Sequence, residues 1–209
     1  MTRHWCVAAG LWMMAQTASA AGDPNWAQTV AREQNPERLV HITLDAVLGV
    51  LRNKELDPRA REEKVSEIVT PVFDFPLMAK LSLGQGPWAK LTRPQRQRFT
   101  DLFVLRLKDT YREKLALYTG EQVMIKPAVA KDKKIQVPTE VVTEDKSVAV
   151  VYLLARLEDR WRVYDVEIEG ISIVRTYRSQ FEEILSKGTV EDLLRRLEAR
   201  PQDPNAPKA

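Results

Sequence analysis

Apolar residues change their spacing near Gly120, and this change largely decides the fold class. Before Gly120 they recur every three or four positions, as they do on one face of a helix. Between residues 121 and 169 they alternate with polar residues, as in half-buried strands, and after Gly170 the helical spacing returns. A chain that runs from helices to strands and back to helices is predicted to be an α+β protein.

Short charged turns divide the alternating segment into four predicted strands, at residues 121–129, 135–141, 147–157 and 161–169. Because these strands follow one another with short connections, we expect an antiparallel meander. Residues 147–157 are apolar on both faces, which indicates a central strand or a strand with one face on a cavity. Pro138 has no amide hydrogen, so it predicts an edge position or a bulge in the second strand.

The longest predicted helix covers residues 92–120. Thr92 is the expected N-cap, Pro94 lies in the first turn, and Gly120 ends the helix. Its apolar side is broad and rich in aromatic residues, so we interpret this helix, with the apolar segment before it, as one wall of an apolar pocket. An ordinary core helix would have the same spacing, and that alternative stays open.

Residues 1–20 have the pattern of a secretory signal peptide. A short basic start is followed by an apolar run and then by Ala18-Ser19-Ala20, a small-residue cleavage site. The apolar run is too short to span a membrane. We therefore expect export, to the periplasm in a Gram-negative cell, with one domain at residues 21–200 and a proline-rich disordered tail at residues 201–209.

Few residues of the exported chain suit covalent or metal chemistry. Removal of residues 1–20 leaves no cysteine and one histidine, His41, which excludes a disulfide, a thiol nucleophile and the usual zinc sites. Glu167 and Glu169 share a strand face, but we interpret them as solvated carboxylates and not as an acid–base pair. The net charge falls from +3 to +2 when Arg3 leaves with residues 1–20, and this is too small to favour nucleic acid. We expect no enzyme activity, no cofactor and no metal; a hydrolase that uses His41 is the weaker alternative.

Two segments have a distinctive sequence, FDFPLMAKLSLG at residues 73–84 and WRVYDVEIEGISIVRTYRSQF at residues 161–181. Together with the signal peptide, the loop that holds Trp88 and the long helix, they resemble the MlaC family over residues 36–197. Members of this family are periplasmic, toluene-tolerance components of a lipid-transport system. The resemblance implies a curved four-stranded antiparallel sheet wrapped by N- and C-terminal helices. It also implies a hydrophobic cavity that takes phospholipid acyl chains, and no covalent chemistry.

The same resemblance implies partners. A member of the family shuttles phospholipid between an inner-membrane ABC transporter with a substrate-binding ring and an outer-membrane lipoprotein–porin complex, which maintains outer-membrane lipid asymmetry. We therefore expect a monomeric periplasmic carrier that binds no nucleic acid. The alternatives are a carrier of the same fold for a hopanoid or another apolar lipid, and a ligand-free adaptor of an ABC transporter.

The expected lipid-contacting residues lie in the apolar segment, the long helix, the third and fourth strands and the helix after Gly170. They are Phe73, Phe75, Met78, Phe103, Leu107, Tyr111, Val151, Leu153, Tyr164, Val166, Ile173 and Tyr177. For each of them, packing in an ordinary core explains the pattern equally well. Five arginines are weaker candidates for contact with anionic head groups, because a solvated surface explains them better: Arg93, Arg96, Arg98, Arg195 and Arg196.

Overall fold

The computed structural model describes residues 26–116, 120–131, 134–142 and 146–199. The expected signal peptide and tail lie outside these ranges. The helices are α1 (Trp26–Arg32), α2 (Pro36–Arg52), α3 (Pro58–Val69), α4 (Phe75–Leu83), α5 (Gln85–Lys90), α6 (Arg93–Ala116), α7 (Ile173–Lys187) and α8 (Val190–Glu198). The strands are β1 (Gln122–Ile125), β2 (Val129–Lys131), β3 (Lys134–Val142), β4 (Ser147–Leu157), β5 (Arg160–Ile168) and β6 (Ile171–Ser172). Within the described ranges, no helix is long and apolar enough to cross a membrane.

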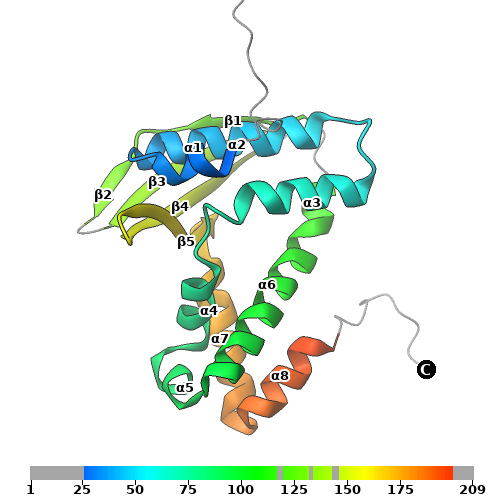
Figure 1. The fold of residues 1–209 in the computed structure, drawn as a ribbon, viewed down its shortest axis with the longest axis vertical. Coiled ribbons are helices and arrows are strands. Elements are labelled where there is room, and N and C mark those ends of the chain that lie inside the picture. Colours follow the sequence, from blue (N-terminus) through cyan, green and yellow to red (C-terminus); the bar gives the residue numbers. More distant parts are fainter. Residues whose placement is uncertain (1–25, 117–119, 132–133, 143–145, 200–209) are drawn as a thin grey trace, which may run out of the picture.

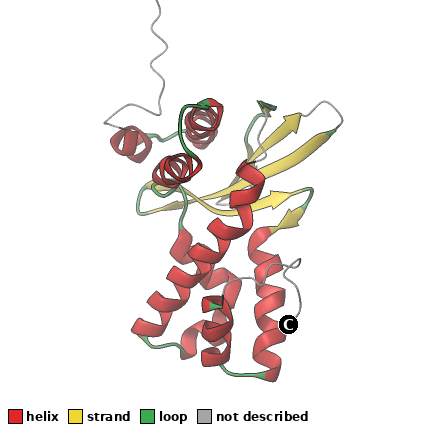
Figure 2. Ribbon diagram, turned by 90° about the vertical axis from the view of Figure 1, so that its right-hand side faces the viewer, coloured by secondary structure: helices red, strands yellow, loops and turns green. Residues whose placement is uncertain are grey.

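The fold is α+β, as predicted. Helices α1 and α2 lie over one face of the sheet, which we call the inner face, and α3 follows beside them (Figure 1). Helices α4 to α8 form a bundle at one end of the sheet (Figures 1 and 2). Val30 of α1 and Leu39 of α2 are buried in one cluster with Val137, Leu154 and Val163 of the sheet. The burial of these aliphatic side chains holds the first two helices on the inner face.

All strand pairs are antiparallel, in the order β1-β3-β4-β5-β6, and β2 also pairs with β3. The meander is confirmed, but the sheet has six strands where four were predicted, because the first predicted strand is split and the short β6 is added. Between the pairs Ile125↔Thr139 and Val129↔Gln136, residues 126–128 lie opposite only two residues of β3. The extra residue interrupts the edge, and Pro138 lies in β3 opposite this interruption.

Strand β5 contains a bulge at Tyr164. Leu153 pairs with Asp165 and Leu154 pairs with Val163, so Tyr164 has no partner on β4. An extra residue in one strand reverses the alternation on one side of it. Val163 therefore shares the inner face with Val166, whereas strict alternation had predicted Tyr164 there.

The bundle has an aromatic core between α6 and α7. The ring centroids of Phe103 and Tyr177 are 5.3 Å apart, and those of Phe99 and Phe181 are 5.5 Å apart, both edge to face. Phe99 and Phe103 have no exposed surface. Edge-to-face aromatic pairs add specific attraction to the burial of their area, so this half of α6 is an ordinary core helix.

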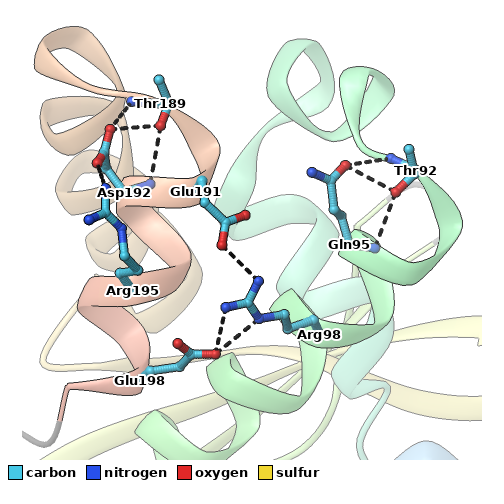
Figure 3. Close-up of polar contacts among 8 residues, drawn as sticks. All are labelled: Thr92, Gln95, Arg98, Thr189, Glu191, Asp192, Arg195 and Glu198. Atoms are coloured by element: carbon cyan, nitrogen blue, oxygen red, sulfur yellow. Dashed lines mark hydrogen bonds and ion pairs between the residues drawn. The ribbon is translucent and has the colours of Figure 1, made fainter.

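Polar contacts fix the N-termini of α6 and α8 (Figure 3). The Gln95 amide donates to Thr92 Oγ1, and the Thr92 amide donates to Gln95 Oε1, which confirms Thr92 as the N-cap. In the same way Thr189 and Asp192 form a capping box on α8, and the hydrogen bonds from Thr189 lower the pKa of Asp192. Helix α6 is described to Ala116, residues 117–119 lie outside the description, and Gly120, the predicted end of the helix, lies outside α6 with a positive φ of 120°.

One arginine joins α6 to α8. The Arg98 guanidinium contacts Glu191 Oε1 and Glu198 Oε1, each at 2.8 Å (Figure 3). These two carboxylates raise the pKa of Arg98 above its ordinary value. Since both partners belong to the same chain, the ion pairs serve the bundle, and a solvated surface role explains Arg98 better than a head-group contact.

Candidate functional site

A partly open cavity of about 580 Å³ lies between α2, α3 and the inner face of the sheet. Figure 2 shows these two layers side by side, with the upper end of α6 reaching between them. The side chains from α2 follow one helical stripe: Val40, Thr43, Leu44, Val47 and Leu51. The side chains from the sheet alternate on one face, apart from the bulge: Val150, Tyr152, Val163, Val166 and Ile168. The cavity therefore lies between the apolar stripe of α2 and the apolar inner face of the sheet. Away from the cavity, both surfaces pack in the hydrophobic core.

The remaining wall comes from α3 and from the ends of the bundle helices. Its residues are Pro58, Arg59, Arg61, Glu62, Val65, Ser66, Val69, Val72, Phe73, Phe75, Met78, Leu107, Lys108 and Ile173. Of the few polar members, Thr43 is satisfied within α2, where Thr43 Oγ1 donates to the Leu39 carbonyl at 2.6 Å. Such a wall favours hydrocarbon over any polar ligand.

Other sites in the described residues lack this apolar character. A second hollow of about 410 Å³ is lined by Asp74, Glu158, Arg160 and Arg162 with only two leucines. Within the described part of the chain, no group of histidine, cysteine, aspartate or glutamate side chains is arranged to hold a metal ion. The 580 Å³ cavity is therefore the candidate functional site.

The structure brings half of the twelve expected lipid-contacting residues together on the cavity wall. These six are Phe73, Phe75, Met78, Leu107, Val166 and Ile173. They come from the segment before α4, from α4, from α6, from β5 and from the start of α7. Contact with a lipid stays a prediction for all of them.

Of the other six residues, five do not line this cavity. Phe103 and Tyr177 are buried in the bundle, and the Tyr177 hydroxyl lies 3.1 Å from Thr110 Oγ1. Tyr111 lies on α6, where the side chain is outside the description. The last three, Val151, Leu153 and Tyr164, lie on β4 or at the β5 bulge, away from the cavity wall. The Tyr164 ring instead lies 4.9 Å from Lys134 Nζ.

The sequence analysis did not predict that residues of α2 and α3 would line the site. Residues 39–51 have a clear helical stripe, but a stripe that packs on a core and one that borders a cavity have the same period. The only available signal was the double-sided apolar pattern of residues 147–157, which does predict a cavity border. It did not say which face, and Val150 and Tyr152 lie on the opposite face from the predicted Val151 and Leu153.

The segment at residues 165–172, part of the distinctive sequence, positions α7 beside the cavity. Asp165 is buried and accepts hydrogen bonds from the Val166 amide (2.8 Å), the Ser172 hydroxyl (2.5 Å) and the Val174 amide (3.1 Å). Ser172 in turn caps α7 through the Arg175 amide. A carboxylate at a helix N-terminus is stabilised by the free amides and the helix dipole. This network fixes where α7 begins and so places Ile173 on the cavity wall.

The family model for the MlaC protein matches residues 42–199. The chain belongs to the MlaC family. Every residue of the cavity wall except Val40 falls within the matched range. The cavity therefore lies within the region that the family model matches.

Two relatives of this MlaC-family chain agree with the assignment. It is 30% identical to the toluene tolerance protein ttg2D of Pseudomonas putida over 160 residues, which is 74% of each chain. A solved phospholipid-binding protein from Ralstonia solanacearum, in complex with a phospholipid, is 27% identical and superposes with a TM-score of 0.73. That comparison covers 78% of this chain and 95% of the other.

Tyr152 supplies a pH test of burial in this MlaC-family cavity. Burial raises the pKa of Tyr152 from 10.0 to about 12. Between these pH values the folded state keeps a proton that the unfolded state has lost, so the free energy of unfolding falls as pH rises. We expect a loss of about 2 to 3 kcal/mol across this interval.

The measurement is urea unfolding at a series of pH values from about 9 to 12. Tyr152→Phe lacks the phenol, so its stability should fall less steeply over the same range, and the difference between the two curves isolates Tyr152 from other titrating groups. Parallel curves for the two proteins would contradict the burial of the hydroxyl.

Proposed function

We propose that this protein binds a phospholipid, with the acyl chains in the cavity between α2, α3 and the sheet, and carries it through the periplasm. The observation that supports this most directly is an apolar cavity of about 580 Å³, within the range of about 300 to 1,000 Å³ that is usual for small-molecule sites. The phospholipid in the Ralstonia solanacearum relative supports the ligand class.

The energetics of hydrocarbon in water explain why such a carrier is needed. Each methylene kept from water contributes about 0.8 kcal/mol, so two acyl chains with about 30 methylenes represent more than 20 kcal/mol. The concentration of free phospholipid in water is therefore negligible, and a carrier must shield the acyl chains from water. Covering them requires no cofactor and no covalent step.

We propose further that residues 1–20 direct export and that residues 21–200 form one lipid-binding domain that works as a monomer. Membership of the MlaC family supports a route between an inner-membrane ABC transporter with its substrate-binding ring and an outer-membrane lipoprotein–porin complex. On this route the protein would help to maintain the lipid asymmetry of the outer membrane.

The test is native mass spectrometry of the full chain, expressed with its leader and purified from the periplasm, followed by organic extraction of its cargo. We expect an adduct with the mass of a diacyl phospholipid. A polycyclic terpenoid mass would contradict the phospholipid and favour a hopanoid carrier. A protein that is empty and takes up no added phospholipid would contradict the carrier function and favour an adaptor.

A further inference from the structure

The charged side chains on the cavity wall come from two helices, α3 and α6. Arg59, Arg61 and Glu62 lie in the N-terminal half of α3, and Lys108 lies in the C-terminal half of α6. In Figure 1 the upper end of α6 overlaps α3, and both helices contribute to the cavity wall. We call these four residues the charged rim. The rest of the wall is aliphatic or aromatic, apart from the hydroxyls of Thr43, Ser66 and Tyr152.

The cations of the charged rim differ in the hydrogen bonds and ion pairs that they already form with other residues of the protein. Arg61 donates to the carbonyls of Asn53 (3.2 Å) and Leu56 (3.1 Å), so it holds the turn between α2 and α3. Arg59 pairs with Glu63 at 3.1 Å, but their side chains are 89% and 62% exposed. An ion pair so exposed contributes little and exchanges readily with another anion.

Lys108 is the cation that is most available to a ligand. It is exposed and makes no hydrogen bond or ion pair with any residue that the structure describes. The preceding residue, Leu107, is 7% exposed and lies on the apolar wall. Leu107 thus borders the apolar cavity, and the next residue, Lys108, borders water. The polar head of an amphiphile meets its acyl chains at such a boundary.

The charge of the rim favours an anion. Its three cations face two carboxylates, Glu62 on the wall and Glu63 paired with Arg59, so positive charge is in excess. An ammonium beside an apolar wall is screened less than one in open solvent. A phosphate diester has one negative charge and oxygens that accept charge-assisted hydrogen bonds. A phospholipid places that phosphate next to its acyl chains, which matches the order of Leu107 and Lys108 along α6.

We propose that Lys108 and Arg59 bind the phosphate of the phospholipid, so that the head group lies at the charged rim between α3 and α6. This inference rests on the proposed function, since it needs acyl chains in the cavity. It assigns Lys108 as the principal phosphate contact, with Arg59 released from Glu63 as the second.

The experiment measures binding of two lipids by isothermal titration, after co-purified lipid has been removed by detergent exchange. Dioctanoyl phosphatidylglycerol carries the phosphate, and dioctanoylglycerol has the same chains without it. The variant is Lys108→Glu. The matched control is Lys90→Glu, which makes the same charge change on an exposed residue of α5 that does not line the cavity.

For the unchanged protein we expect phosphatidylglycerol to bind at least about fivefold more tightly than dioctanoylglycerol, as suits a partly exposed ion pair. Lys108→Glu should remove this preference and leave dioctanoylglycerol binding unchanged, while Lys90→Glu alters neither. The preference should also shrink as salt is raised from about 0.01 M to 0.15 M, because screening increases. Inorganic phosphate, titrated alone, should bind far more weakly than phosphatidylglycerol.

Three results would overturn the inference and leave lipid binding standing. The first is an equal loss of both lipids in Lys108→Glu, which would mean a structural role. The second is phosphatidylglycerol binding that Lys108→Glu does not change. The third is inorganic phosphate that binds at Lys108 without competing with the lipid, which would mean a separate anion site. Failure of the unchanged protein to bind either lipid would instead contradict the proposed function.

Discussion

Val150→Trp is expected to weaken phospholipid binding by more than about 100-fold. Val150 lies in β4, is half-buried, and points into the cavity from the sheet side, opposite α2 and α3. An indole there displaces on the order of four methylenes of cargo, at about 0.8 kcal/mol each, or about 3 kcal/mol in all. Because the new ring occupies empty space, the melting temperature should change little. Vesicle extraction assays with dioleoyl phosphatidylglycerol measure the first effect, and thermal unfolding measures the second.

The matched control is the next residue of the same strand. Val151 is also half-buried, but it lies on the other face of β4 and pairs with Pro138 and Glu167. Val151→Trp should therefore leave phospholipid binding unchanged. If the two variants lost binding equally, the cavity would not be the binding site; if only Val151→Trp lost it, the acyl chains would lie on the outer face of the sheet.

Phe103→Ala is expected to lower the free energy of unfolding by about 3 to 5 kcal/mol, measured by urea denaturation. The Phe103 ring has no exposed surface and contacts three aromatic rings, with centroid distances of 6.3 Å to Phe99, 5.3 Å to Tyr177 and 6.4 Å to Phe181. Its removal leaves a void that rigid neighbours fill poorly. The loss is a large fraction of the roughly 5 to 15 kcal/mol that holds an ordinary domain folded.

A milder variant separates stability from binding if Phe103→Ala fails to fold. Phe103→Leu should lose about 1 to 2 kcal/mol and keep the phospholipid affinity of the unchanged protein, because the Phe103 side chain is not part of the cavity wall. Reduced affinity in a folded Phe103→Leu protein would show that the ring borders the cargo, as the broad aromatic side of the long helix first suggested.

Much of the fold could be predicted because it depends on local chemistry. The Thr92 cap, the helical stripe of residues 39–51 and the switch to alternation after Gly120 each follow from one period or one hydrogen bond, and the structure contains all three. The β4–β5 hairpin also follows from a short charged turn, where Glu158 and Asp159 have positive φ. The β5–β6 turn at Glu169 and Gly170, where φ is also positive, was not predicted, because the sheet was expected to end at Gly170.

The site was less predictable because it depends on irregularities. One extra residue at Tyr164 decides that Val163, and not Tyr164, faces the cavity. Alternation alone cannot locate such a bulge, since both residues are large and apolar enough for either face. Likewise, no period distinguishes the half of α6 that packs in the bundle at Phe103 from the turn at Leu107 that borders the cavity.

Helix α3 shows what an unfilled space does to the rest of the molecule. Its buried side chains, Val65 and Ile68, belong to a small cluster with α2, and Val65 together with Val69 also borders the cavity. Under the proposed function, the acyl chains complete the packing between α3 and the sheet. A ligand that binds only the folded state adds its binding free energy to that of folding. Release of the lipid then lowers the free energy of unfolding of the carrier and loosens α3. A partner that takes the lipid must therefore bind it tightly enough to offset this loss of carrier stability.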